Sequence, residues 1–428
     1  MPVDGNARVS GVPTTSLAIA AFSTVVEWYD FTLYLYLTPI LARVFFPESS
    51  HSVIVVLAGF ALAYLMRPLG AAFFGQGGDR FGRRRTMLWS MELMAIAMLA
   101  TGLLPTADSI GASAGALLML LRCVMAFSVG GEYNGVIAYL LEGANPDRRG
   151  LLTSVAAAAS EIGGLLAVAV AALTMTLVRE GAVSDWAWRI PFLVGAALAA
   201  CVWFARRTMA ESPAFLDLHE ERKTLANPLG ETLRRNRTGI LRAFSISALG
   251  SITYYVGITY VPTFLTTTAQ ASTRVALVVS TAAALAVVVV TPFVGWAADV
   301  FGRRPVLLAL AACGVALPSA LFALLSSPLW ATAMAAAVVL ALLAGGVSAV
   351  GAVASAEQFP ATNRLSGLAL GNTSATVVFG GFAPLAAQLL VDATGWTSSP
   401  GILIALTALA VLPVFWRMPE TRPRAGQS

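Results

Sequence analysis

Long apolar runs constrain what this sequence can fold into more than any other feature. Twelve such segments, each about 20 residues or longer, alternate with mostly short polar stretches. They are rich in Ala, Leu, Val and Gly and lack the two-residue alternation of a membrane barrel strand. Because about 20 apolar residues cross a bilayer as a helix, the sequence predicts an all-α membrane protein with twelve transmembrane helices. The expected spans are 15–44, 53–74, 86–105, 113–141, 151–178, 187–206, 239–267, 275–297, 305–326, 329–357, 365–393 and 399–416.

Composition excludes several other classes of protein. Only 11% of the residues are charged, whereas a soluble domain carries about 25%, which argues against a cytosolic enzyme. Cys123, Cys201 and Cys313 lie in separate apolar runs, so we expect neither a metal site nor a disulfide framework. The arginines occur in short blocks between spans, so the expected partners are a lipid bilayer and a small-molecule substrate, without nucleic acid.

The arginine blocks also predict an orientation. Most of the 27 basic residues fall in loops on one side of the expected spans, whereas only Arg43, Arg179, Arg189 and Arg274 fall on the other. Positive loops remain in the cytoplasm, so both termini are expected there, in a cell inner or plasma membrane. Arg67 and Arg122 remain inside spans.

An internal repeat divides the chain into two halves. GQGGDRFGRRR begins at Gly75 and GWAADVFGRRP begins at Gly295, in equivalent loops 220 positions apart. Glu142 and Arg149 recur as Glu357 and Arg364, and MAESP from Met209 has a weaker echo in MPETRP from Met418. We therefore expect a six-helix bundle at 1–206, a cytoplasmic linker at 207–238, a second six-helix bundle at 239–417 and a short tail at 418–428. Pseudo-symmetric halves of this kind are typical of a transporter whose binding site lies between them.

The repeated loops are predicted to act as gates. Their glycines allow a close approach to neighbouring helix ends, and each aspartate can accept charge-assisted hydrogen bonds from an arginine or from helix N–H groups. The expected gating residues are Gly75, Asp79, Arg83, Arg84, Gly295, Asp299, Arg303 and Arg304.

These loops resemble the hallmark loop of the major facilitator superfamily, and the chain is similar to its metabolite:proton symporters. The matching segments are VVEWYDFTLY from Val25, RPLGAAFFGQGGDRFGRRR from Arg67, VGGEYNGVIAYLLE from Val129, WRIPFLVG from Trp188, ESPAF from Glu211 and FGGFAP from Phe379. The resemblance implies a symporter for proline or betaine, α-ketoglutarate, citrate or shikimate. TYYVGITYVPTFL from Thr253 looks most like the proline/betaine branch. The chain departs from the family at Met125-Ala126 and Gly371-Asn372.

Charges inside the spans are the main candidates for function. Each charge at mid-membrane costs about 2.5–3.5 kcal/mol, so intramembrane charges are expected to be paired, protonated or turned toward a wet cavity. Glu27 and Asp30 share one face of their helix, and Arg122 reaches a similar depth, so an acid–arginine pair is plausible. Similar pairs in related symporters imply proton coupling through Asp30 and Glu27.

Other intramembrane side chains are assigned to structure or to substrate binding. Arg67 and Glu132 are expected to form a structural pair because they lie at similar depth. The predicted substrate-binding residues are Arg122, Glu161, Tyr254, Tyr255 and Asn372, with Arg122 as the only cation expected near the central cavity.

The sequence favours a secondary transporter over a channel or a membrane enzyme. A channel would need a filter motif, and a membrane enzyme would need a group of catalytic residues; the sequence indicates neither. It has no G-x-x-x-x-G-K-[ST] loop, so we expect no cofactor and a proton gradient as the energy source. The sequence thus favours a monomeric proton symporter, not an enzyme, that imports a proline- or betaine-like zwitterion; an organic acid such as α-ketoglutarate, citrate or shikimate is the alternative.

Overall fold

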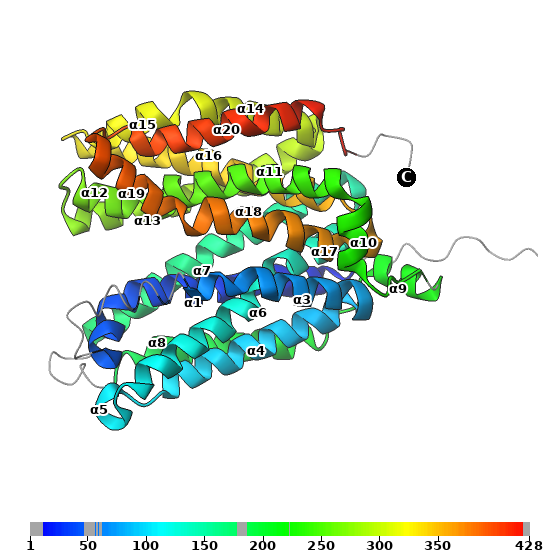
Figure 1. The fold of residues 1–428 in the computed structure, drawn as a ribbon, viewed down its shortest axis with the longest axis horizontal. Coiled ribbons are helices and arrows are strands. Elements are labelled where there is room, and N and C mark those ends of the chain that lie inside the picture. Colours follow the sequence, from blue (N-terminus) through cyan, green and yellow to red (C-terminus); the bar gives the residue numbers. More distant parts are fainter. Residues whose placement is uncertain are drawn as a thin grey trace, which may run out of the picture.

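The protein is built from helices arranged in two bundles. The computed structural model describes residues 12–46, 56, 59, 62–177, 186–221 and 223–422, and no strand occurs among them. Helices of the first half, blue through cyan to blue-green in Figure 1, form one bundle, and helices of the second half, green to red, form the other. The all-α fold with two six-helix bundles is therefore confirmed.

Apart from α3, which continues to Phe81 through part of the predicted loop instead of ending near residue 74, the long helices of the first bundle follow the predicted spans closely. They are α1 (Thr14–Phe45), α3 (Met66–Phe81), α4 (Arg83–Leu103), α6 (Ser113–Gly143), α7 (Arg149–Leu177) and α8 (Arg189–Arg206), with the short α5 (Ala107–Ile110) and η1 (Pro146–Arg148) between them. The part of the predicted span 53–74 that comes before Leu62 lies mostly outside the described residues.

The second bundle is less regular. Its elements are α11 (Arg237–Tyr254), η2 (Tyr255–Thr259), α12 (Val261–Thr267), α13 (Thr273–Phe301), α14 (Arg303–Ala316), α15 (Pro318–Leu325), α16 (Trp330–Ala356), η3 (Ala361–Asn363), α17 (Arg364–Leu368), η4 (Ala369–Thr373), α18 (Ser374–Thr376), η5 (Val377–Gly381), α19 (Ala383–Thr394) and α20 (Ser399–Arg417). The π-helical turns η2, η4 and η5 interrupt the seventh and eleventh predicted spans. The ninth span bends by 49° where Pro318 begins α15.

Helix length and apolarity support membrane insertion. Among the described residues, nine helices are long and apolar enough to cross a membrane, or ten if the bent pair α14–α15 counts as one span. The two remaining predicted spans correspond to α1, which carries Glu27 and Asp30, and to α3, which has 16 residues. The protein is thus a multi-pass membrane protein.

The segment between the bundles, the predicted linker 207–238, contains two short helices. Ser212 caps α9 (Pro213–Glu220), and Asn227 caps α10 (Pro228–Arg235) through hydrogen bonds to the Phe215 and Gly230 N–H groups. Proline at the first helical position favours both starts. α9 and α10 lie at the end of the bundles that also carries α17 (Figure 1). Because the loops at Gly82 and Gly302 lie there too, we call it the arginine-rich end.

The two bundles meet along two equivalent seams. α7 of the first half packs against α13 of the second, and α3 packs against α17 and η4. Each bundle also has its own apolar core; in the first, α1, α4, α6 and α8 surround residues such as Tyr29, Met94 and Trp188. The space between the halves is therefore bordered by α3, α7 and their partners.

Within the first bundle, glycines bring α3 and α6 into backbone contact. A Cβ atom at Gly70 would lie 1.8 Å from the Phe127 carbonyl oxygen, and one at Gly130 would lie 2.2 Å from the Arg67 carbonyl oxygen. Because the obstructing atoms belong to the backbone, a side chain at either glycine would push the helices apart.

We expect Gly70→Ala to lower the melting temperature of the purified protein, since overpacking costs about 1–3 kcal/mol. Gly77→Ala on the same helix is the control, because its Cβ would meet Thr86 at an ordinary 3.6 Å. Thermal unfolding in detergent measures both. Equal melting temperatures for the two variants would show that the α3–α6 contact is not as tight as described.

Candidate functional site

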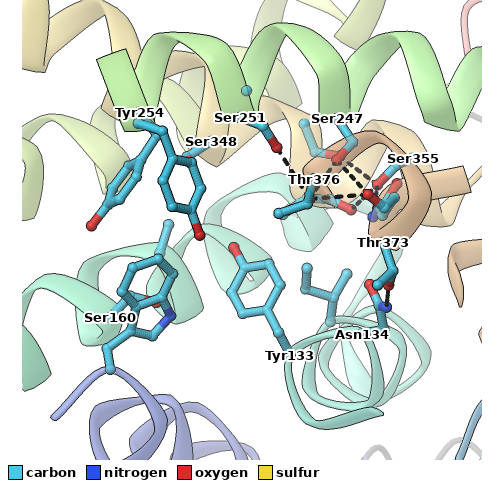
Figure 2. A pocket seen from close by; sticks show the side chains of 18 of the residues that line it. Tyr133, Asn134, Ser160, Ser247, Ser251, Tyr254, Ser348, Ser355, Thr373 and Thr376 are labelled. Carbon is cyan, nitrogen blue, oxygen red and sulfur yellow. Dashed lines mark hydrogen bonds between the residues drawn. The ribbon is translucent and has the colours of Figure 1, made fainter. Parts of the chain in front are cut away.

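A cavity of about 160 Å³ lies between the two halves. α1, α3, α6 and α7 line it from the first half, and α11, η2, α13, α16, η4, α18 and η5 line it from the second. Figure 2 shows Tyr254 near one side of this space and Asn134, Thr373 and Ser355 near the other. The cavity thus lies where a two-bundle transporter holds its substrate.

Hydroxyl and amide groups form the second-half wall of the cavity. The Ser247 hydroxyl donates to the Asn372 carbonyl oxygen at 3.0 Å, and the Asn372 side-chain amide donates to Ser355 Oγ at 3.2 Å. Asn134 of α6 donates to Thr373 Oγ1 of η4 at 3.0 Å, which joins the two halves. The π-helical turns η2, η4 and η5 all lie along this wall, as is common for such turns at functional sites.

Four of the five predicted substrate-binding residues line the central cavity. They are Glu161, Tyr254, Tyr255 and Asn372. The Tyr254 hydroxyl donates to Glu161 Oε1 at 2.5 Å, so the partner that the sequence did not reveal for Glu161 comes from the other half. The two tyrosines belong to an aromatic group with Trp28 and Phe31; the Trp28 and Tyr254 ring centroids lie 5.2 Å apart.

Arg122 does not line the central cavity, contrary to its predicted role in substrate binding. It forms a two-pronged ion pair with Asp30, with Nη1–Oδ2 at 2.8 Å and Nη2–Oδ1 at 3.2 Å. Asp30 is 3% exposed and Arg122 4%. The predicted contact between α1 and α6 is therefore present, but Arg122 is already paired with Asp30 instead of facing the central cavity.

Glu27 lies between this ion pair and the central cavity. A smaller cavity of about 30 Å³ reaches Asp30 and Arg122, and Glu27, Tyr64, Arg67 and Val129 line both cavities. Glu27 is 3% exposed, and its Oε2 atom has no hydrogen-bond partner among the described residues. These four residues, which we call the junction, connect the ion pair to the space between the halves.

The predicted Arg67–Glu132 pair is wrong. Glu132 pairs instead with Arg206 at the end of α8, and Ser90 Oγ donates to Glu132 Oε2 at 2.6 Å. Arg206, which the sequence placed at the edge of the arginine-rich loops, is fully buried and also donates to Ser23 and to the Met87 carbonyl oxygen. Similar depth does not establish contact, because Glu132 faces α4 and α8 rather than Arg67.

Arg67 faces the central cavity instead. Its guanidinium carbon lies 4.4 Å from the Tyr64 ring centroid and 5.4 Å from that of Phe31. Cation–π contacts contribute about 0.5–2 kcal/mol, less than the cost of about 2.5–3.5 kcal/mol for placing the charge at mid-membrane. The sequence therefore predicted the wrong partner for Arg67, which lines the cavity instead of pairing with Glu132.

At the arginine-rich end, each repeated aspartate caps a helix of the other half. Asp79 accepts hydrogen bonds from the Leu365 and Ser366 N–H groups at 3.2 and 2.8 Å. Asp299 accepts from the Gly150 and Leu151 N–H groups, both at 2.8 Å. Free N–H groups and the helix dipole make a helix N-terminus a favourable place for a carboxylate. Both seams are therefore closed at this end by equivalent bonds.

The first repeated arginine of each loop supports this arrangement. Arg83 bonds Glu142 and Arg303 bonds Glu357, with nitrogen–oxygen distances of 3.0 and 3.1 Å. The two seams are not fully equivalent, because the Arg364 side chain crosses the α3–α17 seam and bonds Glu142 at 2.6 Å. Arg83 also donates across the same seam to the Ala361 carbonyl oxygen at 2.5 Å.

The third sequence echo has a structural reason that the sequence did not reveal. Gly82 and Gly302 adopt φ angles of 107° and 100°, a conformation that favours glycine, just before α4 and α14. Glu211 accepts from the Arg83 and Arg84 N–H groups, and Glu420 accepts from those of Arg303 and Arg304. The glutamate of each echo therefore caps a nearby helix: Glu211 caps α4, and Glu420 caps α14.

The remaining predicted gating residues differ in position. Gly75 and Gly295 lie at the seams, where a Cβ would come within 3.0 Å of the Leu365 oxygen and within 2.6 Å of the Gly150 oxygen, respectively. The Arg84 side chain instead donates to the Arg207 carbonyl within the first half, and Arg304 lies 5.8 Å from the Trp416 ring centroid.

Comparisons with known proteins agree with this architecture. Residues 16–236 match the family model "Sugar (and other) transporter", and residues 244–428 match "Major Facilitator Superfamily". A solved structure of the proton:xylose symporter XylE bound to 6-bromo-6-deoxy-D-glucose superimposes with a TM-score of 0.78 at 21% identity, covering 96% of each chain.

Two curated relatives match nearly the whole chain. The ectoine/proline transporter ProP of Corynebacterium glutamicum is 32% identical over 94% of this chain and 85% of its own. The citrate–proton symporter of Klebsiella pneumoniae is 31% identical over 96% of this chain and 93% of its own. The similarity to metabolite:proton symporters is thereby confirmed, and the chain belongs to the major facilitator superfamily of membrane transporters.

Proposed function

We propose that the protein is a proton-coupled symporter that imports a small polar metabolite by alternating access. One observation carries the proposal: the junction connects a buried Asp30–Arg122 ion pair to a cavity that both halves line. A carboxylate that exchanges a proton there can respond to what occupies the cavity. The relatives named as a citrate–proton symporter and an ectoine/proline transporter support the same activity.

Proton coupling is assigned to Asp30 and Glu27. No histidine lies in the described helices that line either cavity, so a carboxyl group must carry the coupling proton. Protonation of Asp30 removes the charge that holds Arg122, and deprotonation restores the pair. Glu27, without a hydrogen-bond partner for Oε2 among the described residues, is placed to pass the proton to the cavity.

Gating is assigned to the seams at the arginine-rich end, which we place in the cytoplasm together with both termini. With Asp79 and Asp299 bonded across the seams, this end is closed. Release of the substrate into the cell then requires these bonds to break while the halves, 1–206 and 239–417, tilt apart. The chain is proposed to work as a monomer in the cell membrane, without a cofactor and without catalysing a chemical reaction.

A zwitterion similar to proline or betaine is the proposed substrate. One cation, Arg67, and two acids, Glu27 and Glu161, line the central cavity among the described residues. Several carboxylates of one ligand would face these acids without enough positive charge, whereas a zwitterion has an ammonium group to offset them. An organic acid carried with protons is the second candidate, because the citrate–proton symporter is a relative of similar identity.

We expect Asp30→Asn to abolish uphill accumulation in proteoliposomes with an imposed proton gradient, because the asparagine cannot exchange a proton. Downhill counterflow should survive, since it needs no coupling. L-Proline, glycine betaine and citrate are tested as labelled substrates. Glu92→Gln is the control, because Glu92 is an exposed acid on α4, outside both cavities. Normal accumulation by both Asp30→Asn and Glu27→Gln would refute the assignment of the proton site.

Asp79→Asn should open the arginine-rich end more often. The variant loses charge-assisted hydrogen bonds worth about 1.5–3 kcal/mol each, enough to shift a two-state population about tenfold. A cysteine at Ser348, in a background without Cys123, Cys201 and Cys313, should then react faster with an impermeant maleimide added from the cytoplasmic side. An unchanged labelling rate would indicate that the loop only anchors topology.

A further inference from the structure

We propose that Arg67 binds the carboxylate of the transported substrate; the inference rests on the proposed function and assigns the anion subsite of the same cavity. Arg67 belongs to the junction and lines both cavities. Its one hydrogen bond among the described residues runs from Nη1 to the Tyr64 hydroxyl at 3.3 Å, and it forms no ion pair with them. A guanidinium carries five N–H donors, so most of them are left for a ligand.

The surroundings hold Arg67 in a defined position. Its carbonyl oxygen lies against Gly130 of α6, where no side chain would fit, so the backbone of α3 is closely packed at this residue. The Tyr64 and Phe31 rings lie beside the guanidinium. A planar, positioned guanidinium matches the two oxygens of a carboxylate, and little flexibility is lost on binding.

The subsite also connects the two halves of the protein. The Tyr64 hydroxyl, which accepts from Arg67, lies 2.6 Å from the Tyr255 hydroxyl of η2. A carboxylate on Arg67 therefore lies next to a contact between the first and second bundles. Substrate binding at this point can change the contact on which the relative position of the halves depends.

Two other intramembrane arginines, Arg122 and Arg206, already form ion pairs with acidic side chains. Arg122 is held by both oxygens of Asp30, and the cavity in front of it, about 30 Å³, is much smaller than the central cavity of about 160 Å³. Arg206 is held by Glu132, and its side chain is fully buried. Glu27 shares the junction with Arg67 but forms no ion pair with it, so Arg67 remains available to an external anion.

Binding to purified protein tests this assignment separately from transport. L-Proline and L-prolinamide differ in the carboxylate alone, so calorimetric titration of both measures what the carboxylate contributes. The wild type should bind L-proline at least about tenfold more tightly than the amide, as expected for a charge-assisted contact. Arg67→Gln should lose that preference, whereas Arg67→Lys should keep part of it.

Arg80→Gln is the matched control, since Arg80 is an exposed arginine on the same helix and should leave the preference intact. Melting temperatures without ligand show whether each variant is folded, and Arg67→Lys retains the charge if Arg67→Gln is unstable. Equal binding of acid and amide by the wild type, or an undiminished preference in Arg67→Gln, would overturn the assignment. A wild type that binds L-proline through Arg67 but does not accumulate it with a proton gradient would refute symport alone.

Discussion

The cost of an unpaired charge inside a bilayer governs how the first half of this protein is built. Two of its intramembrane acids are neutralised by arginines, Asp30 by Arg122 and Glu132 by Arg206. Breaking such a buried pair by removing one partner typically costs about 3–5 kcal/mol, so the pairs hold α1 to α6 and α6 to α8. Among the charges outside these pairs, those on Glu27, Arg67 and Glu161 line the central cavity, whereas Glu92 of α4 is exposed. The charges that hold the bundle together are thus separate from those that face the cavity.

The two halves line the central cavity with different kinds of side chain although they share a sequence repeat. The first half supplies every charged side chain that lines the central cavity among the described residues, and the second half contributes hydroxyls, an amide and tyrosines. The π-helical turns occur in the second half, where the chain departs from regular helix geometry beside the cavity. The two halves therefore contribute different chemistry to the cavity wall, and the Tyr254–Glu161 and Tyr64–Tyr255 contacts join them.

The sequence predicted the architecture well because it depends on segment length and on a repeated motif. Span boundaries such as 113–141 lie within two residues of α6 (Ser113–Gly143), since apolar length alone decides them. The partners of Arg67 and Glu132 could not be obtained this way, because depth along a helix carries no information on which helices are neighbours. Burial of Arg206 was missed for a related reason: a basic residue at a span end is equally compatible with water and with a buried acid. Neither the cross-half bond of Glu161 nor the π-helical turns has a local sequence signal.

The ion pair between Arg364 and Glu142 breaks the symmetry between the two seams. Three side chains bond across the α3–α17 seam: those of Asp79, Arg83 and Arg364. Across the α7–α13 seam, the equivalent hydrogen bonds described above come from Asp299. The seam that is held by more bonds is expected to act as the hinge when the halves move apart. The halves should therefore part first between α7 and α13, so that an opening at the arginine-rich end begins as a one-sided slit although the architecture is nearly two-fold.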